Sequence, residues 1–502
     1  MTSPPQALLT RPPTKLERAI TSWKRPARPM ASALAADTLV AGAVGAVTMG
    51  PALHSERLGV GAFIAAAAVA YVSAVSAWSA KRLNRTWAAF VLLALCLAAT
   101  VSIRDAVWVV VPALLLAVPI GSYAASGGRS WVEVLGGGVA IVPATGLMLP
   151  WAGRGAHRAL LSGRRNTWPI IRTTLIATAL LAVFGGLFIG ADAAFGSLAA
   201  GLTPEVSPNT AIQYGVPGVA TLLLASSAAF LGEAPPPLHI LTPEPAKPAG
   251  RWSWAVPIAA LDLLFLVFCA IQAGVFLADD KDELLRSTGL TYAEYARQGF
   301  FQLVVVTLLV LAVIAGATRY APSATRRDRV TVRALLGLLC ALTLVVVAVA
   351  LRRLYLYEQT FGWTRLRLWV HAFELWLGAV IVLVAIAGVV KGRVPWLPRT
   401  VAASGAAAML VLASINPDGF IADRNVDRFN DTGKIDIVYL NGLSADAVPA
   451  LNRLPEPQRS CALRTLARTL DADDPSLTTN LSRTRARKIL KNNPTTPPTP
   501  CL

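Results

Sequence analysis

Charged side chains are scarce in this chain. Among its 502 residues, Asp, Glu, Lys and Arg make up 15%, whereas hydrophobic residues make up 55%. Soluble proteins carry about 25% charged residues, so this chain lacks the polar side chains needed to cover the several water-exposed domains that its length allows. We therefore predict a multi-spanning membrane protein.

The motifs of common soluble enzymes are also missing. We find no GxxxxGK[ST] phosphate loop, no HExxH, no GxSxG and no GxGxxG after a strand, and the four histidines form no cluster. CxxC and other Cys/His metal spacings are absent too. These absences disfavour an ATP-driven pump or a serine hydrolase. With no standard catalytic motif, the sequence leans against an enzyme, and we expect no cofactor and no metal site.

Positive charge is in excess, and its position along the chain indicates whether it contacts lipid headgroups or nucleic acid. The 46 basic and 28 acidic residues give +18; residues 416–502 hold twelve basic and ten acidic residues (+2), which leaves +16 on residues 1–415. This charge lies between apolar runs, where it faces lipid headgroups. We therefore expect anionic headgroups of the lipid bilayer as the partner, and not nucleic acid.

Twelve apolar runs are long enough to cross a bilayer, which takes about 20 residues. Most tryptophans lie at the edges of these runs, where their rings meet the headgroups. We predict an all-α polytopic membrane domain over residues 33–415. The runs are residues 33–51, 58–80, 87–103, 106–125, 131–150, 171–191, 211–231, 253–278, 300–318, 331–351, 367–390 and 397–415.

Basic loops indicate the orientation, because Lys and Arg favour the cytoplasmic side. The arm 1–32 is rich in proline and basic residues, and we predict that it is disordered and cytoplasmic. Five crossings after it would place the basic stretch Arg154–Arg165 outside. Run 131–150 contains Gly136-Gly137-Gly138 and two prolines, so we expect it to be interfacial or re-entrant. The result is eleven crossings in a plasma membrane with the tail outside; a twelve-crossing chain is the alternative.

The tail after residue 415 is more polar. We expect a small, partly structured extramembrane region at 416–491, with an extended run at 436–440, a helix start at 444–449 and a helix at 460–470. The Pro/Thr-rich end at 492–502 is predicted to be disordered.

Two of the five cysteines, Cys461 and Cys501, lie outside the spans. They either pair as a disulfide, if the tail is extracytoplasmic, or are two unrelated thiols.

Carboxylates inside spans are candidates for a binding site, because they are costly in lipid. Asp192, Asp262 and Glu374 are of this kind, and His371 lies one turn from Glu374 on the same helical face. Such groups either handle a proton or an ion, or they pack as buried hydrogen-bonded residues.

Two interfacial segments are further binding candidates. In the first, 279–300, Thr291 to Glu294 forms a capping box, followed by Arg297. In the second, tyrosines and a tryptophan accompany several arginines between two spans. Each segment either anchors helix ends or holds an anionic amphiphile. The candidate residues are Tyr292, Glu294, Arg297, Arg352, Arg353 and Arg367.

Several stretches, in this order, resemble the uncharacterised bacterial membrane families DUF4153 and DUF4173. They are Val183–Phe188 with Ala191–Phe195, Thr291–Phe301, Arg367–Val370 with Phe373–Gly378, Asn416–Asp418 with Asn425–Arg428, and Leu443–Leu451. The resemblance covers roughly 170–455. It implies a polytopic membrane protein and no established activity.

Two functions fit these observations. One is transport, or the handling of lipid or envelope components, with the intramembrane carboxylates as its site. The other is a membrane-bound sensor or scaffold that docks protein partners, not identified by the sequence, through 279–300 and the tail.

Overall fold

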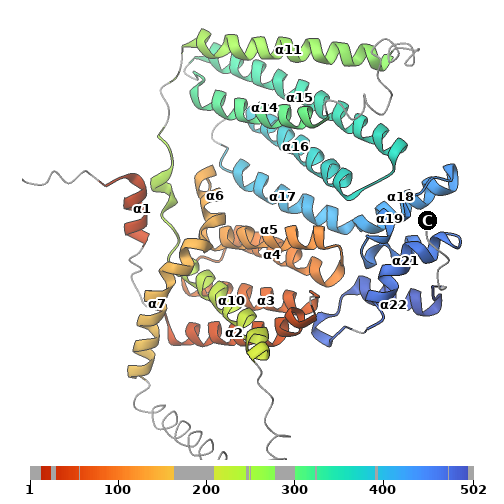
Figure 1. Ribbon diagram of the computed structural model, residues 1–502. Helices are drawn as coiled ribbons and strands as arrows, with labels where there is room; N and C mark the ends of the chain where they lie inside the picture. Colours follow the sequence, from red (N-terminus) through yellow and green to blue (C-terminus); the bar gives the residue numbers. More distant parts are fainter. Residues whose placement is uncertain are drawn as a thin grey trace, which may run out of the picture.

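The computed structural model describes residues 13–23, 30–55, 57–162, 208–244, 248, 250–277, 300–322, 325–390, 394–472 and 474–495. Every regular element in these ranges is helical (Figure 1), as the composition predicts. The longer helices are α1 (Lys15–Trp23), α2 (Ser32–Ser55), α3 (Val60–Ser79), α4 (Arg85–Ile103), α5 (Val107–Ser126), α6 (Trp131–Val139), α7 (Ile141–Ser162), α10 (Pro208–Glu233), α11 (Arg251–Leu277), α14 (Phe300–Tyr320), α15 (Arg326–Phe361), α16 (Arg365–Val389), α17 (Leu397–Ser414), α18 (Pro417–Thr432), α21 (Gln458–Thr469) and α22 (Leu481–Asn492).

Ten of the described helices are long and apolar enough to cross a membrane. They coincide with ten of the twelve predicted runs, because a helix is the conformation in which an apolar segment satisfies its own backbone polar groups in lipid. The run 171–191 lies outside the described residues. The ten are α2–α5, α10, α11 and α14–α17.

The run 131–150 forms two helices, α6 and α7, bent by 62° at a short break. Ser122 of α5 holds this break in place: its Oγ donates to Gly137 O at 2.6 Å and accepts from Ile141 N at 3.1 Å. In Figure 1 both helices run along the left edge, across the ends of the neighbouring spans. This arrangement agrees with an interfacial or re-entrant segment.

The spans form two lobes that meet at α17. The first lobe consists of α2–α5 and α10, and the second of α11, α14, α15 and α16. Small residues allow close packing within the first lobe: a Cβ on Gly42 of α2 would lie 3.4 Å from the carbonyl oxygen of Gly218 in α10. α17 contacts α4 and α5 on one side and α16 on the other, which places it between the lobes (Figure 1).

The amino-terminal arm is partly folded, which corrects the prediction of a disordered arm. Thr14 and Glu17 form a reciprocal capping box that begins α1. Trp23 at the end of α1 is 9% exposed, and its Nε1 donates to Ala234 O at 2.8 Å, next to the end of α10. We call the side of the spans on which α1 lies the arm side.

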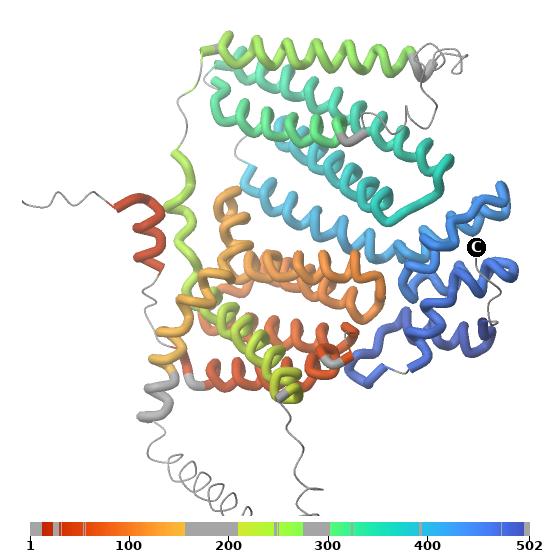
Figure 2. Tube along the Cα trace, in the orientation of Figure 1, coloured from red at the N-terminus to blue at the C-terminus, as the bar shows by residue number. Residues whose placement is uncertain are grey.

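The tail is helical and packs on the opposite ends of the spans, which we call the tail side. Asn480 Nδ2 donates to Val101 O and Arg104 O, each at 2.8 Å, and Asn425 Nδ2 donates to Trp363 O at 2.9 Å. Figure 2 shows the blue carboxyl-terminal helices against the ends of the red and orange ones. Segments that are remote in sequence therefore hold the tail in place.

Within the tail, the predicted extended run 436–440 is wrong. Residues Ile437–Asn441 form the short helix α19, which begins where the Asp436 carboxylate accepts from Tyr439 N at 2.9 Å. The predicted helix start at 444–449 is a 3-10 turn, Ala445–Ala447, followed by α20 (Val448–Leu451). The helix predicted at 460–470 is confirmed as α21.

Candidate functional site

A long apolar groove separates the two lobes inside the membrane region. α5 and α6 form one wall, α16 and α17 form the other, and the cavity measures about 560 Å³. Pro112 and Tyr123 mark its extent along α5, which corresponds to a depth of about 16 Å at 1.5 Å per residue. The side chains facing it are almost wholly apolar. They include Leu116, Ile120, Val134, Leu135, Val139, Ala372, Phe373, Val401, Ala402, Ala408, Met409 and Leu412.

Prolines and small residues keep the groove open. Pro112 and Pro119 lie two turns apart on the same face of α5, and both line the groove with compact rings. Gly138 and Gly405 line the opposing walls, and a Cβ on Gly405 would come within 3.4 Å of the Trp376 ring. The sequence therefore maintains space here that larger side chains would fill.

Aromatic rings line the groove at different depths. Trp131 lies at the arm side, at the start of α6, and Trp369 lies near the tail side. Trp376 lies between these levels and donates its Nε1 proton to Ser404 Oγ at 3.1 Å, so its ring faces the groove without an unsatisfied donor. On the α6 wall, Leu135 and Val139 are 66% and 63% exposed. The groove therefore opens towards the surrounding bilayer beside α6.

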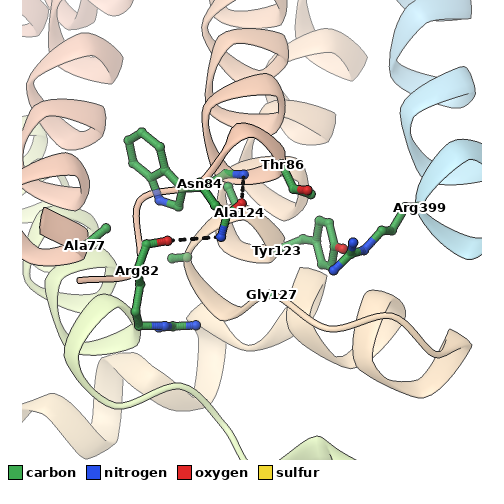
Figure 3. A pocket seen from close by; sticks show the side chains of 10 residues that line it. Ala77, Arg82, Asn84, Thr86, Tyr123, Ala124, Gly127 and Arg399 are labelled. Carbon is green, nitrogen blue, oxygen red and sulfur yellow. Dashed lines mark hydrogen bonds between the residues drawn. The ribbon is translucent and has the colours of Figure 1, made fainter. Parts of the chain in front are cut away.

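A second, smaller cavity adjoins the arm-side end of this groove. It measures about 150 Å³ and shares Tyr123 with the groove. Its wall is polar and basic, in contrast to the groove. Figure 3 shows Arg82 and Arg399 on opposite sides of it. The other lining residues are Ala77, Asn84, Thr86, Trp87, Ala124, Ala125 and Gly127.

Arg82 and Arg399 are both fixed on the turn that ends α5. Arg82 donates to Ser126 O at 2.9 Å, and to Leu231 O and Gly232 O at 3.0 and 2.9 Å. Arg399 Nε donates to Gly128 O at 2.7 Å. Gly127 has φ 75°, a left-handed conformation that favours glycine. Burial lowers the pKa of Arg82 from its ordinary value, but an arginine stays charged in proteins.

The arm-side cavity contains donors but no carboxylate. Trp87 Nε1 is buried and has no hydrogen-bond partner within the described ranges, although indole N–H groups usually find one when buried. Neither Arg82 nor Arg399 forms an ion pair with an acidic residue in the described part of the chain. The cavity is therefore suited to a small anionic group.

The intramembrane carboxylates predicted as a shared site lie apart. Asp262 of α11 is 3% exposed and neighbours Cys340 of α15, whereas Glu374 of α16 is fully buried beside Thr307 of α14. Neither carboxyl group has a hydrogen-bond partner among the residues that the structure describes.

The helix register gives the distance between these two carboxyl groups. Gly378 of α16 faces Val347 of α15. Cys340 precedes Val347 by seven residues, and Glu374 precedes Gly378 by four on the antiparallel helix, so the two carboxyl groups are about 16 Å apart along the helix axes. Neither lines the groove or the arm-side cavity. The third carboxylate, Asp192, lies outside the described residues.

His371 does not pair with Glu374, although both lie on α16. Its Nδ1 lies 3.1 Å from a carboxylate oxygen of Glu358 on α15, and its ring stacks on Trp363 at 5.5 Å. Each of the two predicted partners therefore contacts a different helix.

The arginines of the second predicted interfacial segment, Arg352, Arg353 and Arg367, interact with other residues of the protein. Arg353 donates to Gln272 at 3.1 Å, and Arg367 lies 4.4 Å over the Tyr357 ring. Arg352 also has an interaction partner. Tyr292, Glu294 and Arg297 lie outside the described residues.

A family model described as "Domain of unknown function (DUF4153)" matches residues 88–454. This chain belongs to the DUF4153 family. The match to DUF4153 begins in α4, earlier than the sequence resemblance at about residue 170, and includes both walls of the groove and Arg399. The other family suggested by the sequence, DUF4173, is not shown. No curated protein and no solved structure matches this chain.

The DUF4153 region ends inside the tail, where buried carboxylates attach the tail to the spans. Burial acts to raise the pKa of Asp418, but hydrogen bonds from Arg365 and Ser444 outweigh it and hold the pKa below its ordinary value. For Asp474, burial is likewise outweighed by Arg483, Arg487 and Arg57, and its pKa is also lowered. The tail of this DUF4153 chain is thus held by ionised carboxylates.

Cys461 is disulfide-bonded, whereas Cys96, Cys269 and Cys340 are free thiols. Cys501, whose pairing with Cys461 was one of two alternatives from the sequence, lies outside the described residues.

Sequence reasoning about this DUF4153 chain did not identify the groove or the cavity. Arg82 and Arg399 belong to the basic loops that indicate orientation, and Trp87 is one of the tryptophans at the edges of the apolar runs. One available signal was that each arginine adjoins the end of a span with no acidic residue beside it. The apolar walls carried no such signal, because every span is apolar.

Proposed function

We propose that this protein binds a membrane lipid, with an acyl chain in the interlobe groove, and acts in the transport or handling of lipid or envelope components. The observation that carries the proposal is the groove itself, an apolar cavity of about 560 Å³ between spans. Small-molecule sites in proteins are typically about 300–1,000 Å³ and mostly apolar. The bilayer supplies acyl chains at high local concentration next to this opening.

The depth of the groove supports an acyl chain over other apolar ligands. About 16 Å along α5 is close to half of a hydrocarbon core about 30 Å thick, which is the thickness of one leaflet. The groove also reaches the arm-side end of α5, where Tyr123 precedes the helix end at Ser126. A chain that lies in it therefore begins at headgroup level and ends near the middle of the bilayer.

Lateral entry follows from the exposed α6 wall. Leu135 and Val139 face away from the protein core, and the glycines of α6 leave little side-chain bulk. A lipid then reaches the groove from the bilayer and not from water. Asp262 and Glu374 do not line the groove, so they have no assigned role in binding the ligand.

We also propose that the arm side is cytoplasmic and that the membrane is the plasma membrane. Several basic residues lie in the loops and helix ends of the arm side, among them Arg85, Arg129, Arg326 and Arg327. The positive-inside rule places such loops in the cytoplasm. The disulfide at Cys461 supports the same orientation, because the tail then lies in an oxidising compartment. A phosphatase fused to the carboxyl terminus is expected to be active, and one fused after Leu83 inactive; the reverse pattern contradicts this orientation.

Filling the groove tests the proposed function. Ala402 faces the groove on α17, and Ala407 on the same helix is exposed and does not line it. We expect Ala402→Phe to weaken binding of dioleoylglycerol and dioleoylphosphatidylglycerol to the purified full chain at least tenfold, as measured by native mass spectrometry. Ala407→Phe is the matched control and should bind as the unmodified chain does. Equal binding by the two variants rejects the groove as a lipid site.

A docking scaffold is the second candidate. The tail is folded, and it exposes two large apolar residues, Val438 at 82% and Leu481 at 63%. Equal lipid binding by the two variants described above would favour this candidate.

A further inference from the structure

We infer that the arm-side cavity between Arg82 and Arg399 binds the phosphate of an anionic phospholipid whose acyl chain occupies the groove. The inference rests on the proposed function and adds the class of lipid headgroup. It identifies a headgroup site beside the groove, whose lining residues other than Tyr123 do not line the groove.

The lining of the cavity selects an anion. Its two ionisable groups with a permanent charge, Arg82 and Arg399, are both positive, and the cavity is lined by no Asp or Glu. Trp87 adds a buried N–H without an acceptor, and Thr86 adds a hydroxyl. An anion with several acceptor oxygens satisfies all of these groups at once.

The donors that are left over suit a phosphate group. Arg399 uses its Nε–H on Gly128 O at 2.7 Å, and its guanidinium also interacts with the Tyr123 hydroxyl (Figure 3). It bonds to no carboxylate in the described part of the chain. Arg82 uses three of its five N–H groups on backbone carbonyls. Guanidinium groups bind phosphate oxygens in a bidentate, charge-assisted manner. Both cations are already fixed on the turn at the end of α5, so little side-chain entropy is lost on binding.

The position of the cavity makes the phosphate that of a lipid. Tyr123 lines both the cavity and the groove, so the two sites are neighbours, close enough for the headgroup and an acyl chain of one lipid. It lies at the arm-side ends of α3, α4 and α5, which is the level at which headgroups lie. Trp131 at the start of α6 marks the same level.

The test compares lipids that share acyl chains and differ in headgroup. The purified full chain is titrated with dioleoylphosphatidylglycerol, dioleoylphosphatidylcholine and dioleoylglycerol, and affinities are read by native mass spectrometry. We expect the unmodified chain to prefer phosphatidylglycerol over dioleoylglycerol by at least about tenfold, the value of one charge-assisted hydrogen bond. Phosphatidylcholine, whose phosphate is neutralised within the headgroup, should lie between them.

Two variants assign the preference to the cavity. Arg399→Gln should lower the affinity for dioleoylphosphatidylglycerol about tenfold and leave the affinity for dioleoylglycerol unchanged, so the preference is lost. Trp87→Phe keeps the ring, removes only the N–H group and should lose a smaller part. Arg85→Gln, an exposed residue of the same side outside the cavity, is the matched control for charge and should retain the preference.

The outcomes separate this inference from the proposed function. Equal preference in Arg399→Gln and Arg85→Gln overturns the headgroup site, even where Ala402→Phe shows that the groove holds a chain. Loss of all lipid binding in Ala402→Phe with no headgroup preference in the unmodified chain does the same. Competition by inorganic phosphate or glycerol 3-phosphate at concentrations that leave dioleoylglycerol bound shows a free-phosphate site, and overturns the assignment to a lipid.

Discussion

Arg365 and Asp418 join the first turn of α16 to the first turn of the tail. Arg365 Nε and Nη2 donate to the two carboxylate oxygens of Asp418 at 2.9 and 2.6 Å. Trp108 Nε1 and Ser444 N donate to the same carboxylate, each at 2.8 Å. Asp418 is fully buried, so one carboxylate connects both lobes to the tail.

Removal of this charge should loosen the tail. Asp418→Asn removes the buried charge that accepts from Arg365, whose side chain is 34% exposed, and from Trp108 and Ser444. We expect a loss of about 2 kcal/mol in the free energy of unfolding, the value of a hydrogen bond to a charged group. Asp423→Asn is the control, because Asp423 is exposed and forms a surface pair with Arg453 at 2.7 Å that is worth little. Thermal unfolding in detergent and limited proteolysis of the tail measure the difference. Equal stability of the two variants would contradict the role of Asp418.

The attachment of the tail should depend on acidic pH. The pKa values of Asp418 and Asp474 are lower in the folded chain than their ordinary value of about 3.9. Their contribution to stability is therefore complete above about pH 4 and is lost as the pH falls through the folded pKa values. We expect protease resistance of the tail to be constant from pH 7 to pH 5 and to fall below pH 4.

Asp474→Asn isolates one of these two groups. It should lower stability at pH 7 and make the acid transition shallower, because it removes one of the two carboxylates that must take up a proton. Burial raises the pKa of Asp446, so this group favours folding more at low pH. Its contribution is the same in the unmodified chain and in Asp474→Asn. An unchanged acid transition in Asp474→Asn would count against the assignment.

Hydropathy was enough to predict the spans but not the site. Ten spans were found because each is a continuous apolar segment, and the bend at 131–150 because of its glycines and prolines. The run Ile437-Val438-Tyr439-Leu440 was mistaken for an extended segment because β-branched residues favour strands. This run is helical because Asp436 caps its first turn and because it packs against α21. The groove exists because the apolar faces of α5 and α6 do not pack directly against those of α16 and α17. Hydropathy does not show how these helices pack, so it does not predict the groove.

The intramembrane carboxyl of Glu374 should be dispensable for lipid binding. It is buried, has no hydrogen-bond partner among the described residues and does not line the groove. An unsatisfied buried polar group costs about 1–3 kcal/mol, so we expect Glu374→Met to raise the free energy of unfolding by about 1 kcal/mol. Lipid binding measured by native mass spectrometry should not change. Loss of lipid binding in a stable Glu374→Met chain would return the carboxylates to the functional site.

The most direct test of the lipid-binding account is a cryo-electron microscopy map of the full chain in nanodiscs that contain phosphatidylglycerol. We expect elongated density between α5 and α6 on one side and α16 and α17 on the other, which begins beside Arg399 and runs past Ala402 towards Pro112. A groove closed by its own side chains, or one without density while lipids are resolved elsewhere around the spans, would contradict it.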